Sequence, residues 1–440
     1  MMIEFSFGNF RSFPEMTTLS MVAANISSKY PEIDENNVFE ATPKLKLLKS
    51  KAIYGDNAGG KSNVAKAMVA MLKIVRLSVK DEEVLDHIID PFRLNQKSAN
   101  EPTFFQMIFL HQGDEDVPTL YRYGFEVKKG EIISEWLFGK PRGGEVYFFT
   151  RENMTIRVNP KWFKEAKKFE NLASKDDSEI YRKNSLFLTS VAAVGGVFAK
   201  SIMETIGRST VVSGLNDPKI RVFLREELHN EAARAKVLEF LRAADFDIEG
   251  IEPGSESDDD PPEDMPERLK QLVLQGDVKF RAVPSFKTYK AVFNQKGERV
   301  DSYSDNLDKW ESEGTKKMFH LSLFLIQTLK NGDTLLIDEF DARLHPNLTK
   351  KIVQLFNSKK TNPKGAQLIF ITHDTSLLKP AFLRRDQICF VHKDKFGAST
   401  LRTLVEYKGV RNDASFDKDY LSGKFEAIPF LNRLEQIFEN

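Results

Sequence analysis

One eight-residue stretch limits what this chain can fold into more than any other feature. Residues 55–62 read Gly-Asp-Asn-Ala-Gly-Gly-Lys-Ser and match the pattern G-x-x-x-x-G-K-[ST]. A short strand-like run at 51–54 precedes the match, and residues 62–80 follow it with apolar side chains at helical spacing. A strand, a glycine-rich turn and a helix in this order predict a phosphate-binding loop in an α/β fold.

The residue types of this loop suit phosphate oxygens. Glycines let successive backbone N–H groups turn inward, and the helix that follows directs its N-terminus at the same anion. Lys61 would add a positive charge for the β- and γ-phosphates, with a catalytic role, and Ser62 would ligate Mg²⁺. The predicted nucleotide contacts of the loop are Asn57, Ala58, Gly59, Gly60, Lys61, Ser62 and Asn63.

Polar residues also follow two buried strand-like runs near the other end of the chain. The run at 333–337 ends in Asp338 and Glu339, and the run at 367–372 is followed by His373. Asp338 at a strand end suits a Mg²⁺ contact, and Glu339 could polarise an attacking water as a general base. The carboxyl ends of buried parallel strands are where α/β sheets place ligand sites, so His373 joins this set.

The chain divides into three predicted parts. Residues 1–158 are rich in strand patterns and contain the loop, residues 159–275 are mainly helical, and residues 276–440 alternate strands and helices. The middle part ends in an acidic, proline-containing segment at 255–267. A solvated loop and a docking site for a basic partner are the two interpretations of that segment.

Composition restricts the classes of function. Lys plus Arg and Asp plus Glu both number 64, so the basic excess of many DNA-binding proteins is absent. Cys389 is the one cysteine, which excludes an intrachain disulfide and a zinc site built from thiolates, and fits a reducing compartment. The start of the chain lacks the pattern of a signal peptide, and no apolar stretch is long enough for a bilayer. We expect a soluble cytoplasmic protein without a membrane partner.

Taken together, the motifs resemble the ATPase head of ABC and SMC proteins. Residues 55–63, the Glu-Ser-Glu-Gly-Thr at 311–315, Asp338-Glu339 and His373 have the order and spacing of Walker A, signature, Walker B and switch histidine. Residues 8–13, Gly-Asn-Phe-Arg-Ser-Phe, resemble the start of SMC and RecF-like heads. Three tail segments are similar to the stand-alone OLD-like ATPases of bacterial phage defence, which include the RloA, AbiL and PARIS AriA types: 384–388, 419–424 and 428–429. The resemblance covers about 1–150 and 275–440.

The resemblance implies an α/β P-loop NTPase head of the ABC type, with mixed sheets and an inserted helical subdomain, that uses ATP and Mg²⁺. Two heads would enclose two ATP molecules, with Ser312 and Gly314 of one subunit at the γ-phosphate held by Lys61 of the other. Glu339 would activate water and His373 would sense the γ-phosphate. Arg11 would contact a nucleotide phosphate or the base. Gln96 and Gln106 both remain candidates for the Mg²⁺ ligand of the Q-loop.

The chain also departs from the family pattern. Glu313 stands where transporter-type signatures have Gly, and Asn63 replaces a second hydroxyl residue after the loop lysine. About 250 residues separate Gly60 from Ser312, without the heptads or cysteine pair of a repair-type SMC protein. Fewer than 70 residues follow His373, too few for the C-terminal Toprim nuclease of OLD proteins. We therefore expect an ATPase without its own nuclease.

Three hypotheses of function follow. The first is an ATP-hydrolysing sensor or scaffold of an anti-phage, abortive-infection or toxin–antitoxin system, which forms homo-oligomers, controls a separately encoded nuclease or toxin and responds to a phage trigger protein. The second is a RecF/SMC-like ATPase that binds DNA or DNA ends through local basic clusters at 44–51 and 379–385. The third is a nucleotide-gated scaffold in which ATP turnover is incidental.

Overall fold

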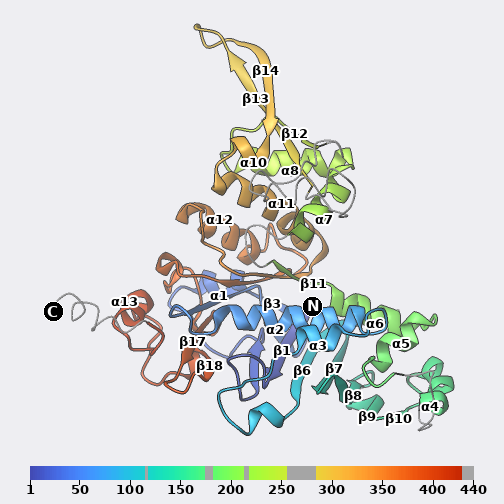
Figure 1. Ribbon diagram of the computed structural model, residues 1–440. Coiled ribbons are helices and arrows are strands. Elements are labelled where there is room, and N and C mark those ends of the chain that lie inside the picture. Colours follow the sequence, from blue (N-terminus) through green and yellow to red (C-terminus); the bar gives the residue numbers. More distant parts are fainter. Residues whose placement is uncertain (114–116, 174–181, 213–217, 255–283, 429–440) are drawn as a thin grey trace, which may run out of the picture. The chain divides into compact units, whose positions relative to one another are not determined.

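The computed structural model describes residues 1–113, 117–173, 182–212, 218–254 and 284–428 (Figure 1). Its contacts divide the chain into two compact units. Unit 1 comprises Met1–Val211, Thr328–Phe340 and Lys350–Asn440, and unit 2 comprises Val212–Gln327 and Asp341–Thr349. The acidic segment 255–267 and Pro429 of the tail lie outside the described residues.

A six-stranded sheet of unit 1 carries the predicted motifs at its strand ends. Its strand order is β11-β15-β16-β5-β17-β18. β15, β16, β5 and β17 are parallel neighbours, and β18 is antiparallel to β17. The bounds are β5 (Ser50–Gly55), β11 (Ser209–Val212), β15 (Thr334–Ile337), β16 (Gln367–Ile371), β17 (Ile388–Lys393) and β18 (Ser399–Thr403). Every residue of β5, β15 and β16 is buried, as expected for parallel strands covered on both faces.

The second sheet of unit 1 has seven strands in the order β10-β9-β8-β7-β6-β1-β2, and its neighbouring strands are antiparallel. Its strands are β1 (Met2–Gly8), β2 (Thr17–Ser20), β6 (Thr103–His111), β7 (Thr119–Lys128), β8 (Glu131–Gly139), β9 (Val146–Glu152) and β10 (Thr155–Val158). The unit also contains a hairpin of β3 (Val38–Thr42) and β4 (Leu45–Leu48). Parallel and antiparallel sheets thus occur together, and the mixed α/β architecture expected from the sequence is confirmed.

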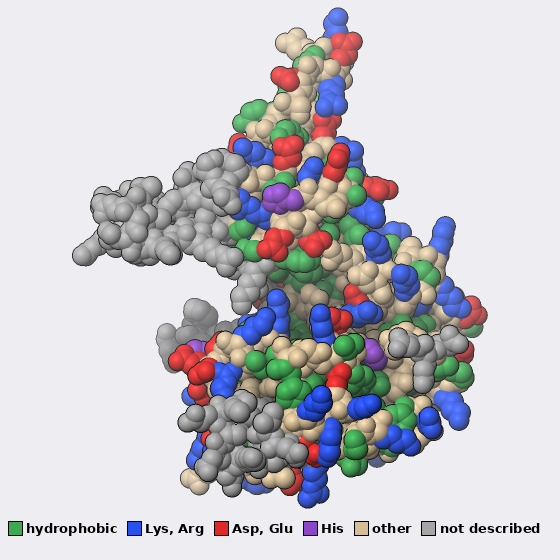
Figure 2. Space-filling view, turned by 90° about the vertical axis from the view of Figure 1, so that its right-hand side faces the viewer, with side chains coloured by type: hydrophobic (Ala, Val, Ile, Leu, Met, Phe, Trp, Pro, Cys, Tyr) green, Lys and Arg blue, Asp and Glu red, His purple; other side chains and the backbone are tan. Residues whose placement is uncertain are grey.

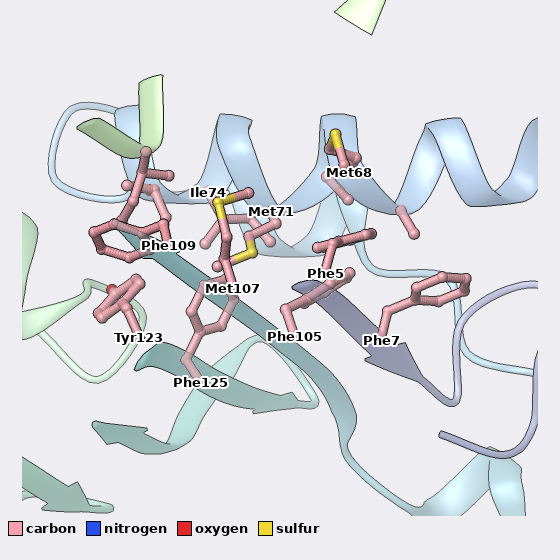
Figure 3. Packing of buried hydrophobic residues seen from close by; sticks show 14 of the residues in the cluster. Phe5, Phe7, Met68, Met71, Ile74, Phe105, Met107, Phe109, Tyr123 and Phe125 are labelled. Atoms are coloured by element: carbon pink, nitrogen blue, oxygen red, sulfur yellow. The ribbon is translucent and has the colours of Figure 1, made fainter. Parts of the chain in front are cut away.

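The helix that follows the glycine-rich loop, α2 (Lys61–Leu77), joins the two sheets in one core. Its buried side chains include Val64, Met68, Met71 and Ile74. Figure 3 shows this face of α2 packed over Phe5 of β1 and over Phe105 and Met107 of β6. The same cluster contains residues of β5, β16 and β17, namely Ile53, Ile369, Ile371, Cys389 and Val391. The position of the loop is therefore set by packing on both sides of α2.

Residues 159–211 belong to unit 1, although the sequence analysis assigned 159–275 to one helical insertion. The reason is a buried anchor between the antiparallel sheet and α5 (Phe187–Ala193). The Glu135 carboxylate accepts hydrogen bonds from the backbone N–H groups of Phe187 (2.6 Å) and Leu188 (3.0 Å). Arg151 donates to Ser185 O at 2.6 Å. The pKa of Glu135 is raised because burial disfavours its charged form.

The remaining described helices of unit 1 are short or lie at its periphery. They are α1 (Pro31–Asn37), α3 (Val84–Ile88), α4 (Lys167–Ala173), α6 (Val197–Gly207) and α13 (Phe416–Leu421), with 3₁₀ turns at Ser98–Asn100, Lys164–Ala166, Thr375–Leu377, Arg385–Gln387 and Leu404–Glu406. In the described part of the chain, no single helix is long and apolar enough to span a membrane, although the bent pair α5 and α6 passes the same test of length and composition.

Unit 2 contains a three-stranded sheet and the helix that bears the signature motif. The sheet consists of β12 (Gly250–Pro253), β13 (Phe286–Phe293) and β14 (Arg299–Asn306), in that order. Its helices are α7 (Pro218–Leu228), α8 (Glu231–Ala243), α10 (Leu307–Trp310) and the first part of α11 (Glu313–Asn331). α12 (Pro346–Asn357) begins in this unit and continues into unit 1. The long β13–β14 hairpin was not anticipated from the sequence.

Candidate nucleotide-binding site

The parallel sheet brings three of the predicted motifs to one edge. Ile337 of β15 pairs with Phe370 of β16, and Ile371 of β16 pairs with Ile53 of β5. Because these strands run in the same direction, the residues that follow them emerge at the same carboxyl edge. Asp338-Glu339, His373 and the loop at 55–62 therefore emerge at the same edge of the sheet in unit 1.

The loop is shaped so closely that its last two glycines have no room for a side chain. Gly60 has a φ of +110°, and a Cβ there would lie 2.5 Å from Ser399 Oγ and 2.7 Å from Ser12 Oγ. A Cβ at Gly59 would lie 2.0 Å from Asp56 Oδ1. Glycine tolerates the backbone of Gly60, and α2 begins at the next residue, Lys61.

Lys61 lies folded back onto the loop. Its side chain is largely buried, and Nζ donates hydrogen bonds to Gly55 O (3.0 Å) and Asp56 O (2.7 Å). The buried Asp56 Oδ1 has no hydrogen-bond partner among the described residues. An unpaired carboxylate acceptor needs a donor, and an ordered water beside the loop would supply one.

The two acidic residues after β15 are held differently. Asp338 is buried, and its Oδ1 accepts a hydrogen bond from Glu339 N at 3.0 Å. Glu339 is exposed and has a φ of +52°, a conformation that costs a non-glycine residue energy and that proteins retain mainly at functional sites. Phe340 N donates to Ile371 O at 2.9 Å and closes the turn. Asp338 is thus fixed at the strand end, whereas Glu339 is open to solvent water.

His373 follows β16, between β5 and β15. The strand is extended past its end because Thr372 N donates to Ile53 O at 3.1 Å. Asp374 N then donates to Thr372 Oγ1 at 3.0 Å, and Tyr54 OH donates to Asp374 O at 3.0 Å. This network positions the exposed His373 on the edge shared with the loop and with Glu339.

Arg11 lies on the other flank of the loop. It occupies a tight turn with a φ of +51°, where Arg11 N donates to Asp90 O at 2.7 Å and its Nε lies 3.9 Å from Asp90 Oδ2. The next residue connects this turn to the loop, because Ser12 Oγ accepts from Asn63 Nδ2 at 2.8 Å. Arg11 and Asn63, both predicted nucleotide contacts, are therefore linked through Ser12.

Three residues of this site escaped the sequence analysis. Ser399 Oγ donates to Gly59 O at 2.7 Å, and Ser399 N donates to Ser12 O at 2.6 Å, so one serine fastens both Ser12 and the loop. Tyr420 of α13 donates to Gly55 O at 3.4 Å and stacks on Phe390. Tyr420 and Ser12 carried a signal, because they lie in the family-like segments 419–424 and 8–13. Ser399 has no local pattern that distinguishes it.

The signature residues belong to unit 2, at the start of α11. Ser312 Oγ accepts a hydrogen bond from Thr315 N at 3.2 Å, as an N-terminal helix cap does. A Cβ on Gly314 would lie 2.8 Å from Arg343 O, which explains the need for glycine. Glu313, the departure from the transporter pattern, is paired with Lys316 and Arg343. The hydrogen bond from Lys316 is the main cause that lowers the pKa of the Glu313 carboxyl.

The two glutamine candidates for the Q-loop have different surroundings. Gln106 Oε1 on β6 accepts hydrogen bonds from Trp136 Nε1 (3.2 Å) and Arg122 Nη1 (3.4 Å). Gln96 is exposed, in the segment that begins at Asp90 beside Arg11. These contacts identify neither Gln106 nor Gln96 as the metal ligand.

The basic clusters named for a DNA-binding function are partly buried within unit 1, whereas Lys44, Lys46 and Lys379 are exposed. Lys49 and Lys51 are buried, and Lys51 Nζ donates to Ser20 O at 2.6 Å. Arg384 is buried too and is paired with Asp34 and Asp386. Figure 2 shows Lys and Arg interspersed with Asp and Glu on the face in view.

The residues present fit a magnesium nucleotide better than a metal site made of protein alone. In the described part of the chain, no group of three or more His, Cys, Asp and Glu side chains gathers to hold a metal. A Mg²⁺ ion usually keeps several waters and takes one or two protein ligands plus phosphate oxygens. Ser62 at the start of α2 and Asp338 at the end of β15 meet that requirement on the protein side.

Comparisons with known proteins found the following similarities. Residues 208–379 match a family model described as an AAA domain, putative AbiEii toxin, of a type IV toxin–antitoxin system. The match includes Ser312, Gly314, Asp338, Glu339 and His373 but begins after the loop. The solved SMC head domain from Thermotoga maritima matches with 13% identity, a TM-score of 0.36, and coverage of 91% of this chain and 98% of that chain. No curated protein matches the chain.

Proposed function

We propose that this chain binds ATP with Mg²⁺ and hydrolyses it to ADP and phosphate. The observation that carries the proposal is the shared edge of the parallel sheet, where the glycine-rich loop, Asp338-Glu339 and His373 emerge from β5, β15 and β16. The match of residues 208–379 to an AAA-type domain supports it independently, because that match does not include the loop.

The chemistry is transfer of a phosphoryl group to water, in which positioning and charge stabilisation supply most of the acceleration. When bound, Mg²⁺ would neutralise charge on the phosphates, with Ser62 and Asp338 as its protein ligands. Lys61 would exchange its contacts to Gly55 O and Asp56 O for phosphate oxygens. Glu339 would orient and deprotonate the attacking water, and His373 would contact the γ-phosphate.

The second part of the proposal is association of two copies through ATP. Ser312 and Gly314 of one copy would contact the γ-phosphate bound by Lys61 of the other. Support comes from the exposed start of α11, where Ser312 and Glu313 lie at the surface of unit 2. Because Glu313 is neutralised by Lys316 and Arg343, its charge opposes phosphate binding less than an unpaired carboxylate would.

The biological role proposed is a sensor or scaffold of an anti-phage system. In the cytoplasm, ATP-driven association would hold or release a separately encoded nuclease or toxin when a phage trigger protein is present. Support comes from the description of the matching family, which names a toxin–antitoxin system, and from the tail that is similar to OLD-like ATPases. Tyr420 of that tail contacts the loop directly, so the tail is part of the site.

The binding step is tested by titrating Mg²⁺-ATP into the full chain and into Lys61→Ala by calorimetry. We expect saturable binding to the unmodified chain and none to Lys61→Ala, because the β- and γ-phosphates lose their main cation. An exposed lysine on the same helix provides the control: Lys66→Ala should bind as the unmodified chain does. Equal affinity of the unmodified chain and Lys61→Ala would contradict the proposal.

The partner is tested by affinity capture from the native host with Glu339→Gln in the presence of ATP, and intact mass measurement of the eluate. A stoichiometric protein from the neighbouring gene would support control of an effector. DNA or repair proteins in its place would favour the RecF-like function instead.

A further inference from the structure

The strand order sets the direction in which a bound triphosphate must run. β15 and β16 lie on one side of β5, and β17 and β18 lie on the other. Asp338, Glu339 and His373 follow β15 and β16, so in the proposed function the γ-phosphate points to that side. The α-phosphate and the nucleoside must then leave the loop on the side of β17 and β18. The following steps rest on that proposed function.

Two chain segments contact the loop or the start of α2 on the side of β17 and β18. The turn at Arg11 reaches it through Ser12, which bonds to Asn63 of α2. The β17–β18 hairpin reaches it through Ser399, which bonds to Gly59 O and Ser12 O. Any base attached to a bound triphosphate therefore meets these two segments first.

A third segment joins them and adds an apolar side chain. Asp90 contacts Arg11 through its backbone and its carboxylate and also pairs with Arg93 at 3.0 Å. The next residue, Leu94, lies against the hairpin, because a Cβ on Gly397 would come within 2.4 Å of Leu94 Cδ1. Gly397 is two residues from Ser399, a span of at most about 7 Å, so Leu94 lies near the mouth of the loop.

The hairpin also carries an exposed aromatic residue, Phe396, directly before Gly397. Leu94 and Phe396 have 69% and 68% of their surface exposed. The backbone of Phe396 is held in position, since Asp394 Oδ1 accepts hydrogen bonds from Phe396 N (2.8 Å) and Ala398 N (2.9 Å). Single exposed apolar residues are common, but here two from distant segments meet at Gly397, since Leu94 lies against it and Phe396 precedes it.

We propose that Leu94 and Phe396 form the nucleobase-binding edge of the nucleotide site, with Arg11 beside them. Aromatic and guanidinium groups bind the π-face of a base, and aliphatic side chains cover its edge. Beside Leu94 lies a hollow lined by residues of its own segment, namely Arg93, Leu94, Asn95, Gln96, Ala99 and Asn100. Because such contacts recognise ring area rather than hydrogen-bonding groups, the site should favour purine over pyrimidine nucleotides.

The experiment distinguishes the contribution of the base to binding from that of the phosphates. Dissociation constants for Mg²⁺-ATP and for inorganic tripolyphosphate are measured on the full chain, on Phe396→Ala, on Leu94→Ala and on the double variant. Loss of one stacked contact should raise the dissociation constant for ATP by about tenfold, with a larger effect in the double variant. The value for tripolyphosphate, which has no base, should not change, and ATP should bind more tightly than UTP only while both side chains are present.

Val194→Ala is the matched control, because it removes an apolar side chain that is 61% exposed elsewhere in unit 1. It should leave both constants unchanged. Unchanged ATP binding in the double variant would overturn the inference, as would equal weakening of ATP and tripolyphosphate. If the unmodified chain bound neither ligand, the proposed function would fail, and this inference with it. If the double variant bound both ATP and tripolyphosphate normally while Lys61→Ala bound neither, the phosphate site would stand and the base site would be excluded.

Discussion

Gly60 shows how a single residue type decides whether the site can form. Its positive φ and the two serine hydroxyls at its surface leave no volume for a methyl group. We predict that Gly60→Ala weakens ATP binding by about tenfold or more, because the loop must take on strain of about 1–3 kcal/mol or move away from Ser12 and Ser399. Calorimetric titration with ATP measures the effect.

Gly144→Ala is the corresponding control, because no atom lies within 4 Å of the Cβ that it would add. It should bind ATP as the unmodified chain does. Normal ATP affinity in Gly60→Ala would show that the loop does not need the conformation described here.

Lys49 gives a prediction about pH. Burial, followed by repulsion from Lys359, lowers the pKa of Lys49 from its ordinary 10.5 to about 8. Between these two pH values the unfolded chain holds a proton that the folded chain has released, so this residue makes the free energy of unfolding rise with pH. Lys49→Met removes that contribution.

Chemical denaturation of both proteins from pH 7 to 10.5 tests this. As the pH rises from about 8 to 10.5, the free energy of unfolding of the unmodified chain should increase relative to that of Lys49→Met. Parallel curves would mean that Lys49 keeps its ordinary pKa in the folded state.

At the scale of elements, the sequence predicted those segments whose hydrophobic period is strong. The helix expected at 62–80 is α2 (Lys61–Leu77), and the buried runs at 333–337 and 367–372 are β15 and β16. A strand-like pattern also runs from Phe5 to Phe13, but β1 ends at Gly8, because Asn9 and Arg11 adopt positive φ in the turn that holds Ser12. A turn held by tertiary contacts leaves no periodic signal, so the sequence extended the strand through it.

The sequence could not predict the elements whose position depends on distant partners. The β13–β14 hairpin is exposed along β14, so its strands lack the alternation of a half-buried sheet. Residues 159–211 join unit 1 because the buried Glu135 and Arg151 bind the chain before and within α5. Ser399 reaches the loop through the pairing of β17 with β5 and β18, which no local pattern specifies.

The core under α2 gives a prediction about stability. Met71 is fully buried between α2 and the antiparallel sheet (Figure 3), so Met71→Ala leaves a cavity in the cluster that holds both sheets. We expect the free energy of unfolding to fall by about 2–5 kcal/mol, measured by denaturant titration. Lys66→Ala, on the exposed face of the same helix, should change it by less than about 0.5 kcal/mol. Equal effects of the two substitutions would contradict the packing described.

At the scale of the whole molecule, the division of the motifs between two units is the main feature. The loop, Asp338-Glu339 and His373 belong to unit 1, whereas Ser312 and Gly314 belong to unit 2. The proposed association of two copies would let unit 2 of one copy complete the site in unit 1 of the other. ATP would then control assembly, which suits a scaffold that holds or releases an effector.

This proposal predicts a change of mass. With Mg²⁺-ATP, Glu339→Gln should have twice the mass of its nucleotide-free form in light scattering, because ATP remains bound. Adding Ser312→Arg should abolish the doubling while ATP still binds to unit 1 of each single copy, since the residue is exposed and lies outside unit 1. Doubling that persists in the Ser312→Arg protein would exclude the signature helix from the interface.

The central claim is that one sheet edge of this chain hydrolyses ATP with Glu339 as the base. Steady-state release of phosphate from Mg²⁺-ATP, measured beside calorimetric binding for the full chain and for Glu339→Gln, tests it most directly. We expect saturable release of phosphate by the full chain. In Glu339→Gln we expect turnover to fall by about a hundredfold or more while ATP affinity is retained. Normal turnover by Glu339→Gln, or no ATP binding by the full chain, would contradict it.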